Sequence, residues 1–287
     1  MLTRLGILLI MNKLSTEKRA QVIAALVEGV SINATVRMTN VSKPTILKLL
    51  KDLGCACAEY QDRTLRGLKC RRLQCDEIWS FVLMKQKNIP AARVGEWGIG
   101  DVWTWTAIDA DTKIIPSWLI GPRDAGTAHA FIEDLASRLT HRVQLTTDGL
   151  KAYLDAVYDA FGGEVDFSQL VKLYGAEQAG EARYSPPKCI GCRKTKIIGK
   201  PDPEHVSTSY VERQNLSMRM GMRRFTRLTN AHSKKVENHE HAVALYFMHY
   251  NFARVHMSLR VTPAMEARIA DHVWSLEEIV GLLDRPV

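Results

Sequence analysis

The sequence predicts an α/β protein in which a mixed sheet flanked by helices follows a small all-α domain. Residues that start and stop helices are frequent in the first 54 positions, whereas residues 73–121 consist mainly of apolar runs rich in strand-forming residues. Beyond residue 125, helix-like and strand-like segments alternate. Strands followed by alternating helices and strands are typical of a mixed sheet. With 46% hydrophobic residues in a chain of 287, a sizeable core is expected and wholesale disorder is excluded.

Three short helices are predicted between residues 14 and 54. Each begins at a Ser or Thr that can accept a hydrogen bond from the first turn. Pro44 also fits an early position of the third helix. The capping residues are Ser15 or Thr16, Ser31 and Ser42, and the expected stops are Gly29 and Gly54. We expect this domain to span residues 1–54 and a linker with a basic end to span residues 55–72.

The second and third of these helices, joined by a short turn, resemble a helix-turn-helix. In that arrangement the third helix enters the major groove of DNA. It would present Lys43, Thr45 and Lys48 to the groove. The alternative is a small helical bundle with a solvated lysine face, and we favour DNA binding.

The second domain is expected to cover residues 73–270. Its β-rich runs lie at residues 73–85, 101–110 and 113–121, and Asp109 to Thr112 can close a hairpin between the last two. Residues 175–207 hold several Pro and Gly residues and are expected to be a loop or an insertion. The other expected elements are helices at 125–139, 149–161, 207–225 and 234–252, strands at 141–148 and 168–175, and a last short helix within 271–287.

The positive charge of the chain is concentrated in one segment. The whole chain carries a net charge of +8, and its isoelectric point is about 9.2. Residues 182–235 alone contain 13 Lys and Arg against three Asp and Glu, a net of +10, so the remainder is slightly acidic. A concentrated basic patch favours nucleic acid as the partner.

The cysteine content and the N-terminal residues indicate which cellular compartment to expect for the protein. Six cysteines in a chain of 287 residues do not suggest a disulfide scaffold and fit a reducing cytoplasm. The apolar opening, MLTRLGILLIM, is too short to span a membrane and lacks a cleavage site, so no membrane partner is expected. Met11 begins a more ordinary soluble N-terminus, and both Met1 and Met11 stay open as the start.

Three carboxylates lie in distinctive local settings. Asp76 sits inside an apolar strand, where a charge is costly unless it is paired or bound to a metal. Asp148 lies at the C-terminal end of a strand, where α/β sheets tend to place functional groups, and Glu212 opens a basic helix. Two metal ions about 4 Å apart can activate an attacking oxygen and stabilise a leaving oxygen in phosphoryl transfer. We therefore predict that Asp76, Asp148 and Glu212 bind divalent metal and carry catalysis.

Each carboxylate also has a plainer interpretation. Asp148 could cap the following helix, and Glu212 could be an acid that the helix dipole favours. Glu77 competes with Asp76, but strand alternation places these two side chains on opposite faces. Only one of them is then expected to point into the site, and we prefer Asp76. Asp109 is expected to be a hairpin-turn residue.

The basic helix after residue 207 predicts contact with DNA. Glu212, Asn215 and Arg219 fall at i, i+3 and i+7, which is one helix face. This face would carry a metal ligand, an amide donor and a cation for a DNA phosphate. Four further arginines extend the cationic surface: Arg213, Arg223, Arg224 and Arg227. Their alternative role is a solvated face, whereas phosphate contacts would position DNA without reading its sequence.

Other metal-binding patterns in the chain are weak. Cys189 and Cys192 form a single CxxC motif, and a structural zinc site usually needs four ligands. No second pair has suitable spacing, so we interpret these two as loop cysteines. His239 and His241 are two residues apart and do not share a helical face.

At this point the sequence resembles a known family, the bacterial insertion-sequence transposases of the DDE class. The resemblance rests on Asp76, Asp148 and Glu212 together with YVERQNLSMRMGMRRFTRLTNAHSKK and MHYNFARVHMSLRVTPAMEA, which are similar to the IS-one-like group. It covers residues 12–270. It implies an RNase H-like core after a helix-turn-helix, Mg²⁺ or Mn²⁺ as cofactor, nicking at the ends of a mobile element, and attack of the freed 3′-hydroxyl on target DNA. Double-stranded DNA and a homo-oligomer that brings two ends together are the implied partners.

The chain departs from the family pattern at one point. On the family model Asp76 and Asp148 flank the metals, and Glu212 completes the ligands of the second metal. Sixty-three residues separate Asp148 from Glu212, far more than in retroviral integrases, so the segment is an insertion or the third ligand lies elsewhere. His205, near this segment, is a further candidate. Two rival functions stay open: a nuclease that does not join DNA, and a regulator or inactive copy that only binds DNA.

Overall fold

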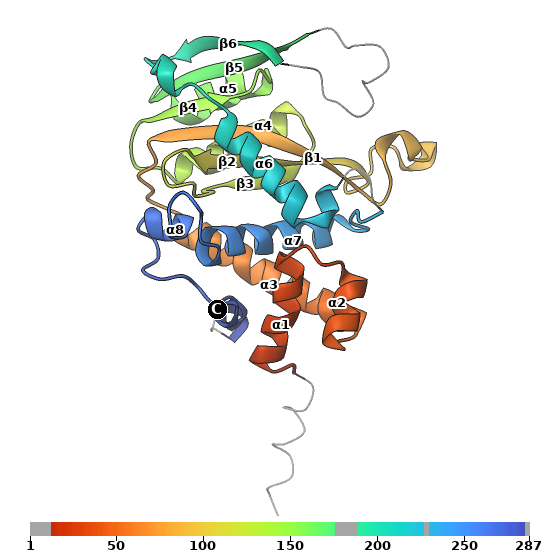
Figure 1. Cartoon of the computed structure of the whole chain (residues 1–287). Helices are drawn as coiled ribbons and strands as arrows, with labels where there is room; N and C mark the ends of the chain where they lie inside the picture. Colours follow the sequence, from red (N-terminus) through yellow and green to blue (C-terminus); the bar gives the residue numbers. More distant parts are fainter. Residues whose placement is uncertain (1–12, 176–188, 227–229, 285–287) are drawn as a thin grey trace, which may run out of the picture.

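We describe the fold from a computed structural model of the chain (Figure 1). The structure describes residues 13–175, 189–226 and 230–284. The apolar opening with its two candidate start residues, and Arg227, lie outside these ranges. Within them, no helix combines the length and the apolar character that crossing a membrane requires.

The centre of the molecule is a mixed sheet of six strands in the order β3-β2-β1-β4-β5-β6 (Figure 1). β1 runs parallel to β4, and β4 runs parallel to β5, whereas the other neighbours are antiparallel. This order is compatible with an RNase H-like fold. The strands are β1 (Arg72–Val82), β2 (Gly100–Asp109), β3 (Trp118–Gly121), β4 (Val143–Thr147), β5 (Val165–Tyr174) and β6 (Cys189–Ile198).

Helices cover both faces of the sheet, as the sequence predicted (Figure 1). Because side chains alternate along a strand, Ile78 and Val82 pack with one helix pair, α6 and α7. Trp105 on β2 points to the opposite face and packs against Phe131 and Tyr153 of the other pair, α4 and α5. The bounds of these helices are α4 (Ala125–Ser137), α5 (Ala152–Phe161), α6 (Ser209–Gly221) and α7 (Val236–Met248).

Three helices precede the sheet: α1 (Thr16–Val27), α2 (Ile32–Thr39) and α3 (Lys43–Thr64). The side chains of Ser15, Ser31 and Ser42 accept backbone hydrogen bonds at their starts, which confirms the predicted caps. The predicted end of α3 at Gly54 is wrong, because the helix continues to Thr64. A Cβ at Gly54 would lie 2.6 Å from the Cα of His241, so this glycine allows α7 to cross α3 at close range. Residues 55–64 of the expected linker are therefore helical.

Two other expectations need correction. β3 begins only at Trp118, because the side chain of Asn251 binds both the N–H and the C=O of Ile115 and removes that residue from strand pairing. The segment predicted as a loop contains β6, which pairs antiparallel with β5. The Asp109 turn is confirmed, since its carboxylate accepts hydrogen bonds from the N–H and hydroxyl of Thr112.

The N-terminal helices and the sheet share one hydrophobic core. Ile23 of α1, Leu53 of α3 and Leu145 of β4 belong to the same buried cluster. The chain closes on this core with α8 (Pro263–Glu266) and α9 (Leu276–Gly281). The division at residues 54 and 72 therefore does not separate two independent cores.

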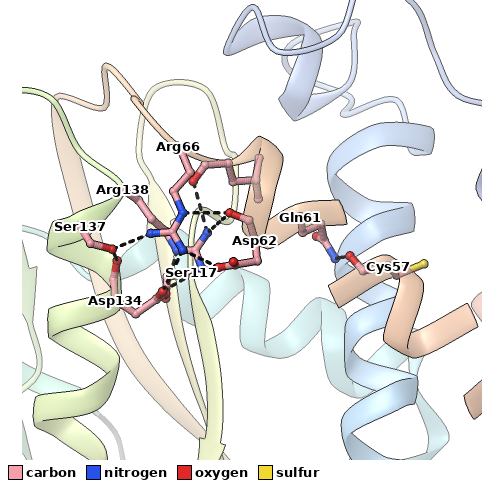
Figure 2. A network of polar contacts seen from close by, with 9 residues as sticks. Cys57, Gln61, Asp62, Arg66, Ser117, Asp134, Ser137 and Arg138 are labelled. Carbon is pink, nitrogen blue, oxygen red and sulfur yellow. Dashed lines mark hydrogen bonds and ion pairs between the residues drawn. The ribbon is translucent and has the colours of Figure 1, made fainter. Parts of the chain in front are cut away.

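A network of polar side chains fastens the end of α3 to α4, and Figure 2 shows it from close by. The buried Arg138 donates to Asp62 at 2.7 Å and to Asp134 at 2.7 and 2.8 Å. Arg66 donates to the hydroxyl of Ser137 at 2.7 Å. Arg138 therefore links α3 to α4 by charge-assisted hydrogen bonds to a carboxylate on each helix.

Candidate metal centre

Three carboxylates converge where β4 leaves the sheet. β4 pairs with β1 only as far as Thr147, which lies opposite Cys75. The next residue, Asp148, lies beyond the ladder, next to the Asp76–Glu77 pair of β1. One oxygen from each of Asp76, Glu77 and Asp148 lies within 4.8 Å of the others. Among the described residues, this is the group of acidic, His and Cys side chains that could hold a metal ion.

The inclusion of Glu77 corrects the expectation that only one of the adjacent acids points into the site. Alternation does place Asp76 on the α6 face and Glu77 on the α5 face, since they contact Asn215 and Tyr153 respectively. However, in the described part of the chain the ladder between β1 and β4 ends at Cys75. Side chains from both faces can therefore reach round the strand toward Asp148.

Glu77 and Asp148 are linked by the guanidinium of Arg123. Arg123 Nε donates to Glu77 Oε2 at 2.9 Å, and a terminal nitrogen lies 3.4 Å from Asp148 Oδ2. The Tyr153 hydroxyl donates to the other oxygen of Glu77. Asp148 Oδ1 accepts from the Leu150 N–H at 2.9 Å, so Asp148 stabilises a turn before α5 and does not cap that helix. Both Glu77 oxygens are thus engaged within the protein.

Asp76 is fixed from α6. Asn215 Nδ2 donates to Asp76 Oδ2 at 2.9 Å. Two residues earlier on the same strand face, Gln74 Oε1 accepts from the N–H groups of Tyr210 and Val211 at 2.8 and 3.2 Å. Thr208, at the N-cap of α6, makes no side-chain cap bond, and the Ser207 hydroxyl accepts from the N–H of Ser209 alone. β1 therefore caps the next two N–H groups of α6 and sets the register of this helix against Asp76.

Glu212 lies one helical turn before Asn215 and outside the group of three acids. Thr208 Oγ1 donates to Glu212 Oε1 at 2.6 Å, and Lys172 of β5 forms an ion pair with the other oxygen. Residues three apart on a helix lie about 5–6 Å apart at Cβ, which keeps Glu212 beside the cluster. The charge of Glu212 contributes to the raised pKa of Asp76.

The electrostatics of the cluster favour a bound cation. Burial, followed by the charges of Glu77 and Asp148, raises the pKa of Asp76 to about 7. Burial also raises the pKa of Glu77, and the charge of Asp148 adds to the effect, against hydrogen bonds from Tyr153 and Arg123. Carboxylates that repel each other in a buried place gain most from a divalent ion, because its charge relieves the repulsion.

The donor set fits Mg²⁺ or Mn²⁺. Every candidate ligand atom is a carboxylate oxygen, which is the hard donor that these ions prefer. Asn215 Oδ1 and the hydroxyl of Thr106, which lies opposite Asp76 on β2, are buried and have no hydrogen-bond partner among the described residues. Unpaired buried oxygens beside a carboxylate are suited to hydrated metal, because water bound to the ion could donate to them.

The predicted recognition helix exposes Lys43, Thr45 and Lys48, although their contacts differ. Lys43 has no described ion pair, whereas Lys48 pairs with Asp52 on the next turn. Thr45 shares a hydrogen bond with the capping hydroxyl of Ser42 at 2.8 Å. The exposed start of α3 is therefore accessible, and DNA binding by it stays a prediction.

The basic residues of α6 and the segment after it fall into two groups. Arg213 and Arg223 are exposed, as a DNA contact requires. Asn215 differs from the prediction, because it is buried and its amide donates to Asp76. Arg219 donates to the backbone oxygen of Phe225 at 3.2 Å, and Arg224 donates to the Ser233 hydroxyl at 2.7 Å. Of the predicted phosphate contacts described, Arg213 and Arg223 thus keep the clearest access to solvent.

The remaining candidate ligands do not join the site. Cys189 and Cys192 lie exposed on β6 as free thiols. His205 contacts Arg72 at 3.0 Å, away from the three acids. His239 is fully buried between the hydroxyls of Ser80 and Ser233.

Comparison with known proteins adds little to this geometry. No family model matches the sequence, and no curated protein matches it. Among solved structures, the crystal structure of the Mos1 strand transfer complex is similar, with 13% sequence identity and a TM-score of 0.25. The match covers 81% of this chain and 77% of that chain. At this level of similarity, we interpret the site from its own residues.

Sequence reasoning missed the residues that hold the carboxylates in place. Gln74 could have been found, since it is a polar residue two positions before Asp76 on the same face of an apolar strand. No sequence pattern around Arg123, Tyr153 or Lys172 indicates a role in the site. Their roles follow from contacts made in the folded chain, in which Arg123 and Tyr153 bond to Glu77 and Lys172 bonds to Glu212.

Proposed function

We propose that the protein is a DNA transposase that binds the ends of an insertion sequence, cleaves DNA and joins 3′-hydroxyl ends to target DNA. The observation that carries this proposal is the convergence of Asp76, Glu77 and Asp148 at the end of β4, with Glu212 beside them on α6. An all-oxygen site in a basic protein suits a phosphodiester substrate.

Asp76, Asp148 and Glu212 would hold Mg²⁺ or Mn²⁺, in keeping with the resemblance to DDE transposases. The bound ions would neutralise charge that develops on the phosphate and lower the pKa of the attacking hydroxyl. Glu77 acts differently in this proposal, because Tyr153 and Arg123 engage both its oxygens. It orients Arg123 toward the cluster, where that guanidinium can turn to a phosphate oxygen.

The remaining residues bind and position the substrate. Arg213, one residue after Glu212, and Arg223, beyond the end of α6, are exposed and hold the DNA backbone, and the start of α3 contacts DNA further along. Asn215 and Gln74 keep α6 in register with β1, which fixes Glu212 relative to Asp76. Joining two element ends requires a homo-oligomer, which is part of the proposal.

The test is a cleavage and joining assay. Labelled DNA with the terminal repeats of the element is incubated with a plasmid target and Mg²⁺ or Mn²⁺. We expect end cleavage and joined product from the wild type, and a loss of at least about a hundredfold in Asp76→Asn and Glu212→Gln. Glu133→Gln, an exposed acid on α4 with no described contact, is the matched control and should retain activity.

Each rival function has its own outcome in this assay. Cleavage without joined product would indicate a nuclease with this fold. End binding without cleavage would indicate a DNA-binding regulator or an inactive copy, provided that a related active transposase works in the same buffer. Full activity in Glu212→Gln would move the third ligand to Glu77.

A further inference from the structure

A cavity separates the N-terminal helices from the chain that follows α6. Its volume is about 410 Å³, which falls in the range of small-molecule sites. Residues of α1, the α1–α2 turn and α3 form one wall, and residues 222–224, 230–235 and α7 form the other. Gly29 lies at the contact between the two walls, since a Cβ there would come within 2.7 Å of the backbone oxygen of Gly221.

Among the described residues that line the cavity, none is Asp or Glu and five are cationic. The five are Lys43, Arg223, Arg224, Lys234 and Lys235. Their charge is felt by nearby groups. Burial and then the charge of Lys234 lower the pKa of His232, and burial and then Arg224 lower the pKa of His239 to about 3. The cavity therefore has a positive potential that an anion would neutralise.

Arg224 is the residue that points most directly to an anion. It is largely withdrawn from solvent, and its described contact is with the hydroxyl of Ser233 at 2.7 Å. No carboxylate pairs with it among the described residues. Burial of this unpaired guanidinium lowers its pKa to about 10. A partly buried arginine without a counter-ion loses part of its hydration, and a phosphate would supply both the charge and hydrogen-bond acceptors.

Part of the cavity lining is apolar. Leu26, Val27, Leu47 and Leu245 line it together with the ring of Tyr246. An inorganic anion alone would leave this surface in contact with water. A ligand that joins a phosphate to a flat ring would match both parts, and a nucleotide has this chemistry.

The position of the cavity relates it to the acidic cluster. α6 connects the two, since Glu212 lies in its first turn and Gly221 ends it beside the cavity. A helix rises 1.5 Å per residue, so the nine steps from Glu212 to Gly221 span about 14 Å. One strand of duplex DNA advances about 3.4 Å per nucleotide, and four steps cover that distance.

We propose that this cavity receives an unpaired nucleotide of the DNA strand that lies at the acidic cluster. The phosphate contacts Arg224 and two exposed lysines of the lining, Lys43 and Lys235, and the base packs on the apolar side chains. This inference rests on the proposed DNA substrate. It adds a site at which the protein holds one nucleotide out of the duplex, separate from the carboxylates.

The test measures binding in EDTA, so that it needs no cleavage. The probe is a duplex with one unpaired 2-aminopurine, compared with the same duplex fully paired. We expect the unpaired probe to bind about tenfold or more tightly, with a change in 2-aminopurine fluorescence. The preference should disappear in Arg224→Gln and in the double variant Lys43→Ala/Lys235→Ala. Lys87→Ala/Lys196→Ala, two exposed lysines outside the cavity, should keep it.

Three outcomes would overturn the proposal. The first is equal affinity of the wild type for the two duplexes. The second is a preference that survives both cavity variants. The third is tight binding of free dAMP that competes with the duplex, because it would assign the cavity to a free nucleotide. If Arg224→Gln fails to fold, the cavity variant Lys43→Ala/Lys235→Ala decides the question. Failure of DNA cleavage in Mg²⁺ would affect the proposed function and leave this binding result intact.

Discussion

At the scale of single residues, Asp76 predicts how metal binding depends on pH. Its pKa of about 7 means that the metal-free site holds a proton at pH 5 to 6, and a divalent ion must displace it. We expect the affinity for Mn²⁺ to rise by up to about tenfold per pH unit below pH 7 and to level off above it. Titration of Mn²⁺ by electron paramagnetic resonance between pH 5 and 8 would measure this.

The same pKa has a consequence for stability, with a defined sign. The unfolded chain loses the Asp76 proton near pH 4, whereas the folded protein keeps it to about pH 7. The folded state therefore binds more protons in this window, and without metal the free energy of unfolding should fall as pH rises. Asp76→Asn should flatten both the stability slope and the Mn²⁺ profile, and Glu133→Gln should change neither. A Mn²⁺ affinity independent of pH would contradict this assignment.

Residue-scale reasoning from the sequence succeeded where a charge stood in an apolar strand. Asp76 was found because its setting makes an unpaired charge costly. Glu77 was set aside by strand alternation, which is correct for a strand with neighbours on both sides. The end of the β4 ladder at Thr147 changes that geometry, and the sequence around Glu77 holds no sign of where a distant strand ends.

At the scale of elements, the attachment of α6 to β1 predicts that Gln74 positions Glu212. Gln74→Met keeps the volume but removes the acceptor for the Tyr210 and Val211 N–H groups. Loss of a helix cap costs about 0.5–2 kcal/mol of stability. We expect activity to fall by about tenfold to a hundredfold, because a small displacement of Glu212 weakens the site. Metal-dependent cleavage and thermal unfolding would be measured together.

A matched control separates positioning from general destabilisation. Gln61→Met also removes a buried glutamine, which bonds to Ala244 and Asn251 away from α6. It should lower stability by a similar amount and leave the metal dependence of cleavage unchanged. If both variants lose activity in proportion to their stability, Gln74 has no specific role in positioning.

The sequence predicted helix boundaries correctly where residues close by in the chain determine them. Serine caps marked the starts of the three N-terminal helices because the cap acts within four residues. Gly54 was misread as a stop, since its reason is the close crossing of α7, nearly 190 residues later. β6 was missed for the same kind of reason, because its exposed residues alternate weakly and their pairing partner is β5.

At the scale of the whole molecule, the shared core predicts that the chain unfolds as one unit. Leu53 of α3 is fully buried in the cluster that also contains Leu73 of β1 and Leu145 of β4. Leu53→Ala should lower the free energy of unfolding by about 2–5 kcal/mol. Native-state hydrogen exchange should then show the loss in amides of β1 and β4 as well as in α1 to α3, because these amides exchange through global unfolding.

The sequence instead divided the chain at residues 54 and 72, on the basis of a change in pattern from helix to strand. That division predicts a different result, in which Leu53→Ala weakens protection only within residues 13–64 and leaves the sheet unchanged. Met38→Ala, on an exposed side chain of α2, is the control and should alter protection in neither region by more than about 0.5 kcal/mol. Loss confined to the helices would mean that the Arg138 network and the apolar contacts dock two separable domains. Loss throughout would mean that the proposed DNA contact at α3 and the proposed metal site at β1 belong to one cooperative structure, so that a ligand on either stabilises both.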